Sequence, residues 1–199
     1  MHIPLFLDVQ DWSVLIVGGG KIALRKAREL SDAGASINLL APQRCPGWED
    51  IKVQWLKDEF SDQMLVNYNL VIAATDDATL NKNITELAKK KGILCNCASA
   101  GKTGDVIFPG VVRENGITVA ISTQGETPFI TKRLKTEALK ITQSYSRETI
   151  ELLGAIRREI IANYPEKKEE LLEKLSSVPI EILQEKGNIH EITDWLQGE

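Results

Sequence analysis

The chain has 199 residues, of which 43% are hydrophobic, and a formal net charge of −4. This size and composition predict one large globular domain with appendages, and the acidic balance argues against a general nucleic-acid binder. The N-terminus lacks the basic region and apolar core of a secretory signal. No apolar run reaches the roughly 18–20 residues that span a bilayer, so we expect a cytoplasmic protein without a membrane segment.

The first predicted elements surround a glycine-rich turn. Ile3 to Val9 alternate loosely and indicate a short edge segment, and Val14 to Val17 form the first apolar strand. Gly18 to Gly20 follow, and Lys21 to Ala33 has helical periodicity. In the pattern G-x-G-x-x-A, the first glycine makes a tight turn, the second lets the backbone approach a pyrophosphate, and the alanine, Ala23, allows the helix to pack on the strand. A glycine motif between a strand and a helix is typical of a dinucleotide-binding domain.

The rest of the first half continues the alternation of apolar strands and helices. The predicted strands are 37–40, 53–55, 70–74 and 93–97, and the predicted helix is 80–91. Continuous apolar strands of this kind predict an α/β fold with a Rossmann-like doubly wound parallel sheet. We place this NAD-binding domain at residues 1–112.

The second half has a different pattern. Strands at 106–112 and 117–122 flank a hairpin turn, and a long helix opens at Thr127 and Pro128, with Thr127 as its N-cap. We expect a small α+β dimerisation section at 113–146 and a helical C-terminal section at 147–199. An apolar stripe in that section predicts core or interface packing. It comprises Ile150, Leu153, Ile156, Ile160 and Ile161.

The cofactor site is predicted at the carboxyl ends of the strands. The candidate cofactor-binding residues are Gly18, Gly20, Lys21, Ile22, Ala41, Pro42, Gln43, Thr75 and Asp76. An NAD enzyme usually has an acid near the end of the second strand, where it binds the adenosine ribose. This chain has none there, so backbone groups or Gln43 must substitute. Arg44 either lies in a solvated loop or binds the 2′-phosphate of NADP. Thr75 and Asp76 either line the cleft or cap the following helix.

Two further clusters contain residues of types that bind ligands. Cys95 and Cys97 share a face of a strand, but a structural zinc site needs four ligands, and we expect no metal site. The turn Ser122–Pro128 offers hydroxyl and N–H groups to an anion, and Lys132 and Arg133 follow on the same helix. The alternative for this second cluster is a capped helix with a solvated basic face.

Taken together, these motifs resemble the precorrin-2 dehydrogenase / sirohydrochlorin ferrochelatase family, the dehydrogenase part of siroheme synthases. The resemblance covers roughly residues 1–145. It is carried by Val17–Lys26, Ala73–Asp77, Asn96, Phe108-Pro109 and Ala120–Pro128. It implies oxidation of precorrin-2 to sirohydrochlorin with NAD as cofactor, and a homodimer. The carboxylates of the tetrapyrrole would be bound by Asn96, Ser122, Thr123, Lys132 and Arg133, with Lys102 and Arg113 as further donors.

The chain departs from the family pattern at one position. Many members have an Asp three residues after the asparagine matched by Asn96, and it is taken as the acid/base residue. Here that residue is Ser99, and a serine cannot act as a carboxylate base without an activating partner. Either Asp105, the nearest acid in sequence, takes over or no base is required. Ser99 and Asp105 are therefore the candidate catalytic residues.

Three functions remain open at this point. The first is NAD-dependent oxidation of precorrin-2, and the second adds ferrochelatase activity, with Fe²⁺ as a second substrate. The third is an NAD(H)-sensing Rossmann module that binds NADH without turnover, which would account for the missing Asp. The turn Ser122–Pro128 argues against the sensor, because a sensor has no need of it.

Overall fold

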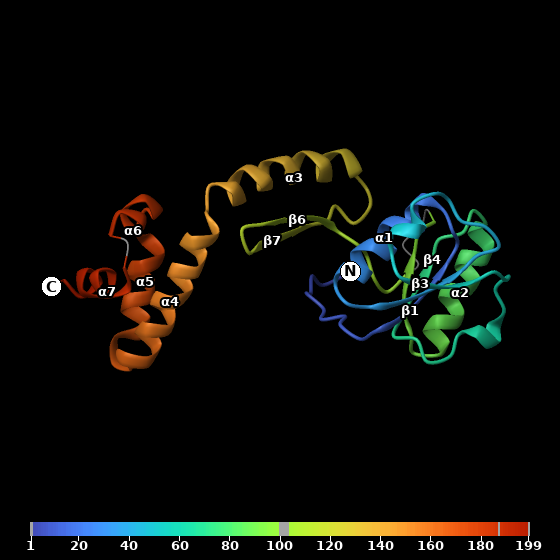
Figure 1. The fold of residues 1–199 in the computed structure, drawn as a ribbon, viewed down its shortest axis with the longest axis horizontal. Helices are drawn as coiled ribbons and strands as arrows, with labels where there is room; N and C mark the ends of the chain where they lie inside the picture. Colours follow the sequence, from blue (N-terminus) through green and yellow to red (C-terminus); the bar gives the residue numbers. More distant parts are fainter. Residues whose placement is uncertain (1, 100–103, 187, 199) are drawn as a thin grey trace. The chain divides into compact units, whose positions relative to one another are not determined.

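A computed structural model of the chain describes residues 2–99, 104–186 and 188–198. It divides into two compact units, Met1–Phe108 and Pro109–Glu199 (Figure 1). The functional sections predicted at 1–112, 113–146 and 147–199 stay a prediction. The first unit contains β1 (Ser13–Val17), α1 (Lys21–Asp32), β2 (Ser36–Leu40), β3 (Val53–Leu56), β4 (Leu70–Ala73), α2 (Ala78–Lys90) and β5 (Leu94–Cys97).

The described residues of the first unit form a five-stranded sheet in the order β3-β2-β1-β4-β5, with every pair parallel. The chain runs from β1 outward to β3 and then returns to the other side of β1 as β4. The strand order therefore reverses between β1 and β4, which is where open α/β sheets bind ligands. The predicted doubly wound parallel sheet is confirmed.

Helices α1 and α2 cover opposite faces of this sheet, because the crossovers from β1 to β2 and from β4 to β5 run in opposite directions along it and have the same hand. On one face, Ala23 and Ala27 of α1 pack against Ile16 and Ile72. On the other, α2 packs through Ile84 and Ala88 on residues that include Leu15 and Val71. Both faces of β1 and β4 are thus buried, which explains why these strands are continuously apolar.

The segment before β1 differs from the expectation. Residues 3–9 contain no strand, and Ile3, Leu5 and Phe6 are 73%, 68% and 76% exposed. Pro4 has no N–H to give to a ladder, and Val9 is the buried hydrophobic residue of this stretch. The loose alternation of apolar residues in this segment was therefore a poor indicator of an edge strand.

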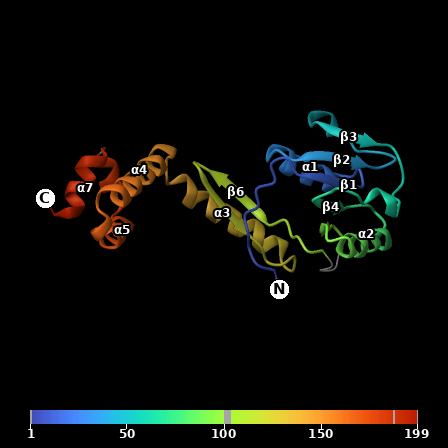
Figure 2. The ribbon, with the colours of Figure 1, turned by 90° about the horizontal axis from the view of Figure 1, so that it is seen from below.

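The second unit begins with an antiparallel hairpin of β6 (Gly110–Glu114) and β7 (Ile117–Ile121). The next helix runs beside the hairpin in both views (Figures 1 and 2). It approaches closely, since a Cβ on Gly110 would lie 2.7 Å from Thr131 Cγ2. The helices of this unit are α3 (Pro128–Gln143), α4 (Arg147–Asn163), α5 (Lys168–Ser177), α6 (Ile180–Lys186) and α7 (Ile189–Gln197).

The apolar stripe of α4 lies in a core formed by these C-terminal helices. Ile156 and Ile160 are fully buried, together with Leu171, Leu183 and Ile192. Much of the stripe is therefore internal packing rather than an interface. Among the residues that the structure describes, no helix combines the length and apolarity needed to cross a membrane.

Lys26 is a charged residue buried in the first unit. Its side chain lies on the inner face of α1, the residue is 6% exposed, and its Nζ atom is 4.1 Å from the centre of the Phe108 ring. Burial, which is the largest cause, and the nearby positive charge of Arg25 together lower the pKa of Lys26 from 10.5 to about 8, while Glu29 opposes the shift. The ammonium form is therefore disfavoured in the fold.

We expect Lys26→Met to stabilise the protein at pH 7. The folded pKa lies below the unfolded one, so the penalty for the buried charge is complete below pH 8 and disappears as the pH rises towards 10.5. A pKa shift of this size destabilises the folded protein by about 3 kcal/mol. Loss of the cation–π contact in Lys26→Met offsets about 1 kcal/mol of the gain. Denaturant unfolding should show a gain of about 2 kcal/mol at pH 7 that shrinks above pH 8. A gain that does not change with pH would contradict this account.

Candidate functional site

The glycine turn is formed by tight backbone packing at the end of β1. Gly18 has φ +111°, and a Cβ there would lie 2.3 Å from the carbonyl oxygen of Ala74. Its N–H donates to Leu40 O at 2.9 Å. Only glycine combines this conformation with this contact. The turn is thereby held directly against the chain that leaves β4.

The start of α1 has the properties of a phosphate site. Gly20 is the N-cap, no side chain caps the helix, and a Cβ on Gly20 would have no atom within 4 Å. The first N–H groups of a helix have no intrahelical partner, and they lie at its positive dipole end. Lys21 and Ile22 are exposed beside this open space. These residues fit the pyrophosphate of a dinucleotide.

The expected adenosine end lies beyond β2. Ala41 is buried and bonded through its carbonyl oxygen to Trp55 Nε1 at 2.9 Å, whereas Pro42 and Gln43 are exposed. The guanidinium carbon of Arg44 is 4.2 Å from the centre of the Trp55 ring, and Lys57 Nζ is 4.3 Å from it. Arg44 is thus stacked on an indole and lies half-buried in the loop that follows β2. Trp55 and Lys57 were not predicted as site residues.

We expect this arrangement to favour NAD⁺ over NADP⁺ in kcat/KM. Arg44 is already engaged with Trp55, and we expect no dedicated cluster for a 2′-phosphate here. Arg44→Ala should therefore leave the ratio of kcat/KM for the two nucleotides nearly unchanged, with Lys57→Ala as the matched control. A preference for NADP⁺ that Arg44→Ala abolishes would assign this arginine to the phosphate instead.

The end of β4 contributes Thr75 and Asp76, and the structure separates their roles. Thr75 is half-buried and bonded through both its N–H and its hydroxyl to Asn81 Oδ1, at 3.0 and 2.8 Å. Asp76 is exposed. The cap of α2 is Asp77, which accepts from the N–H groups of Thr79 and Leu80. Thr75 is therefore fixed next to the glycine turn, and Asp76 remains available to a ligand.

The end of β5 contributes two predicted site residues, Ser99 and Asn96, which differ in exposure and in hydrogen bonding. Ser99 is half-buried, and its Oγ accepts a hydrogen bond from Asn81 Nδ2 at 2.7 Å. Asn96 is 6% exposed; its Nδ2 donates to Val106 O at 2.6 Å, and its Oδ1 is buried without a partner among the described atoms. The Asn96 amide thus helps to hold the segment that follows residue 103 against β5.

Asp105 is exposed on that segment. The backbone on either side of it is pinned, because Val106 N–H donates to Cys95 O at 3.0 Å and a Cβ on Gly104 would lie 2.7 Å from the same oxygen. This packing limits any movement of Asp105 towards the cleft. Lys102, a predicted donor, lies outside the described residues.

The buried cysteine of β5 has ordinary structural surroundings. Cys95 is buried and its Sγ lies 3.6 Å from Thr85 Oγ1. Burial raises the pKa of the Cys95 thiol to about 11, which keeps it protonated at neutral pH. The described residues contain no group of three or more His, Cys, Asp or Glu side chains that could hold a metal ion.

The other predicted substrate-binding residues belong to the second unit. Ser122 Oγ accepts from the N–H of Gln124, and Thr123 Oγ1 is 3.0 Å from Thr131 Oγ1. Thr127 is the N-cap of α3, but its side chain makes no capping bond. Its backbone N–H donates to Thr123 Oγ1 at 3.3 Å. Lys132 and Arg133 are exposed on α3. The turn is thus pre-formed, with cations on the helix that follows it.

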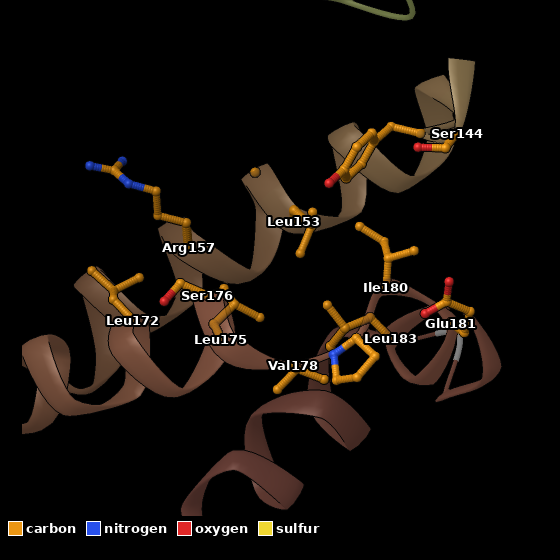
Figure 3. Close-up of a pocket in the computed structure, with 13 residues that line it drawn as sticks. Ser144, Leu153, Arg157, Leu172, Leu175, Ser176, Val178, Ile180, Glu181 and Leu183 are labelled. Carbon is orange, nitrogen blue, oxygen red and sulfur yellow. The ribbon is translucent and has the colours of Figure 1, made fainter. Parts of the chain in front are cut away.

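The second unit also has a cavity of about 720 Å³ among the C-terminal helices. Figure 3 shows Leu153, Leu175 and Leu183 around it, while the Arg157 guanidinium extends outward. None of the predicted site residues lines this cavity.

Comparison with known proteins agrees with the geometry. A family described as "Putative NAD(P)-binding" matches residues 5–110. The chain belongs to this family. The predicted class of cofactor is therefore confirmed, and the matched residues include the glycine turn and the ends of β2, β4 and β5.

The curated relatives are longer proteins. A siroheme synthase of Sodalis glossinidius (strain morsitans) is 36% identical over 160 residues, covering 78% of this chain and 34% of the relative. One of Pseudoalteromonas translucida (strain TAC 125) is 36% identical over 163 residues, covering 80% and 34%. The chain spans about a third of the length of these relatives. These similarities agree with the family resemblance expected from the sequence.

A solved structure is similar to the chain over nearly its full length. It is described as "SirC, precorrin-2 dehydrogenase", and the match has a TM-score of 0.72, 25% identity and coverage of 98% of both chains. The fold class predicted from the sequence is therefore confirmed, including the helical C-terminal part.

Proposed function

We propose that the protein oxidises precorrin-2 to sirohydrochlorin with NAD⁺ as the hydride acceptor. The observation that carries the proposal is the coincidence of two features. An open, uncapped helix N-terminus adjoins the strand reversal between β1 and β4, and a precorrin-2 dehydrogenase matches the chain over 98% of its length. Anaerobic incubation of precorrin-2 with NAD⁺ tests it, by the appearance of the sirohydrochlorin spectrum.

The chain's own groups would bind and orient the reactants. Gly18, Gly20 and the first turn of α1 would hold the pyrophosphate, and Thr75 and Asp76 would lie towards the nicotinamide end. Bound NAD⁺ supplies the hydride acceptor. Loss of a hydride leaves the substrate with a proton to release, and water or a weak base can accept it. This step therefore does not require a carboxylate at position 99.

We place the substrate's carboxylates against the turn Ser122–Pro128 and the cations of α3. The N–H groups and hydroxyls of this turn, together with Lys132 and Arg133, suit the carboxylates of a tetrapyrrole. Fe²⁺ would be a second substrate only for a chelatase, which we propose to be weak here. We place the reaction in the cytoplasm, because it draws on the NAD⁺ pool there.

We expect the protein to form a homodimer through the hairpin and α3. Several apolar side chains of α3 are exposed, among them Phe129 (70%), Ile141 (63%) and Leu134 (44%). Exposed apolar groups at this density are typical of an interface. Light scattering at micromolar concentration should give the mass of two chains, and Phe129→Glu with Ile141→Glu should give the mass of one. A monomeric unmodified protein would contradict this expectation.

A further inference from the structure

A buried asparagine connects the ends of β4 and β5. Asn81 lies in α2 and is 1% exposed. Its Oδ1 accepts from the N–H and the hydroxyl of Thr75 at 3.0 and 2.8 Å. Its Nδ2 donates to Thr75 O at 2.8 Å and to Ser99 Oγ at 2.7 Å. Asn81 thus uses both donors and both lone pairs of its amide, the full capacity of the group.

The orientation of this amide follows from its backbone partners. The N–H of Thr75 needs an acceptor and the carbonyl of Thr75 needs a donor, so Oδ1 and Nδ2 cannot be exchanged without losing both bonds. The group that faces Ser99 is therefore an N–H donor. Ser99 Oγ must accept from it, which directs the hydroxyl proton away from Asn81. Among the described residues, no other partner of the Ser99 side chain is found.

The network adjoins the cofactor site. Thr75 follows Ala74, whose carbonyl oxygen would be 2.3 Å from a Cβ on Gly18. Gly18, Thr75 and Ser99 follow β1, β4 and β5, three adjacent parallel strands, and so lie along one edge of the sheet. A half-buried hydroxyl at this edge, with its proton uncommitted, is suited to an acceptor on a bound ligand.

We propose that Asn81 is a positioning residue that holds the Ser99 hydroxyl as a hydrogen-bond donor towards an oxygen acceptor of the bound ligand. The inference rests on the proposed function, in which two groups supply such an oxygen: the carboxamide of the nicotinamide and a carboxylate of the tetrapyrrole. Position 99, where the family resemblance led us to expect an acid, then has a different role here. Ser99 donates a hydrogen bond and does not take up a proton.

The test compares the effect of Ser99→Ala in two backgrounds. Asn81→Asp keeps the acceptor for Thr75 but replaces Nδ2 with an oxygen, so the Ser99 hydroxyl would turn and donate to it. In the unmodified protein, Ser99→Ala should weaken NADH binding or lower kcat/KM for precorrin-2 by about tenfold, the effect of one hydrogen bond. In Asn81→Asp the same change should have less than about a twofold effect, since the donor is already turned away.

The controls separate positioning from folding. Thr85→Val removes the bond from Thr85 Oγ1 to Asn81 O, 2.8 Å long, without touching the Asn81 amide, and should leave the effect of Ser99→Ala at about tenfold. Ser99→Thr retains the hydroxyl and should recover most of the loss. If Asn81→Asp does not fold, Asn81→Ser removes the same donor without adding a charge.

The two readouts identify the source of the acceptor. A loss in NADH affinity, measured by fluorescence titration, indicates the carboxamide, whereas a rise in KM for precorrin-2 alone indicates a carboxylate. Equal effects of Ser99→Ala in both backgrounds, or no effect on either readout in the unmodified protein, would overturn the proposal. The titration needs no turnover, so failure to oxidise precorrin-2 would reject the proposed function and still leave the role of Asn81 to be decided by NADH binding.

Discussion

Gly20→Asp should abolish detectable NAD⁺ binding while leaving the protein folded. A Cβ on Gly20 meets no atom within 4 Å, so the fold can accept the side chain. Gly20 has φ −78° and ψ 177° at the N-cap of α1, and Asp is a favoured N-cap residue that adds a few tenths of a kcal/mol of stability relative to glycine. Its carboxylate would take the N–H groups intended for phosphate. It would also repel the pyrophosphate by about 4 kcal/mol at 4 Å.

We therefore expect Gly20→Asp to weaken binding of the dinucleotide without lowering the stability of the protein. The dissociation constant for NADH should rise by roughly a hundredfold or more, while the melting temperature is unchanged or higher. Gly20→Asn is the matched control, because it has the same shape and can cap the helix without the charge, and Gly20→Ala tests added volume alone. Unchanged NADH affinity in folded Gly20→Asp would remove the assignment of this turn to the cofactor.

Ser99→Asp should create or strongly raise ferrochelatase activity. Metal insertion must remove pyrrole protons, and a positioned carboxylate is a suitable acceptor, with general-base assistance worth roughly 10²–10⁴-fold. The surroundings can hold the new group, since Asn81 Nδ2 lies 2.7 Å from Ser99 Oγ and can donate to a carboxylate there. Oxidation depends on NAD⁺ for its driving force, so dehydrogenase activity should fall only by about the tenfold expected from loss of the Ser99 hydroxyl. The measurement is insertion of Fe²⁺ or Co²⁺ into sirohydrochlorin.

Two controls accompany this substitution. Ser99→Asn has nearly the same shape and lacks the charge, so it should not raise metal insertion. Asp105→Asn should leave oxidation largely intact, because Asp105 is exposed on a segment whose backbone is bonded to β5. An unmodified protein that inserts metal at a rate comparable to its dehydrogenase turnover would contradict the proposal that Ser99 limits this activity.

The strands and helices of the first unit could be predicted from the sequence because the spacing of apolar residues reflects which side chains are buried. Strands buried on both faces, such as Val14–Val17, are recognisable as continuous apolar runs. The glycine turn was equally clear, since its spacing reflects steric demands such as the approach of Gly18 to Ala74 O. The site residues contributed by this turn could therefore be placed on a physical argument.

The features that the sequence did not reveal depend on contacts between distant residues. Asn81 looks like an ordinary polar position of a helix, and its importance appears only when the ends of β4 and β5 are brought together. Likewise, nothing in the sequence near Arg44 indicates that Trp55 lies beneath it. The stripe on α4 was correctly identified as apolar, but its partners in α5, α6 and α7 decide that much of it is internal core.

The central claim is tested most directly by anaerobic incubation of the purified protein with precorrin-2 and NAD⁺, following the sirohydrochlorin spectrum and NADH absorbance together. We expect both products to appear in equal amounts, and neither to appear with Gly20→Asp. Tight binding of NADH without formation of either product would contradict the claim, and is what a nucleotide-sensing module predicts.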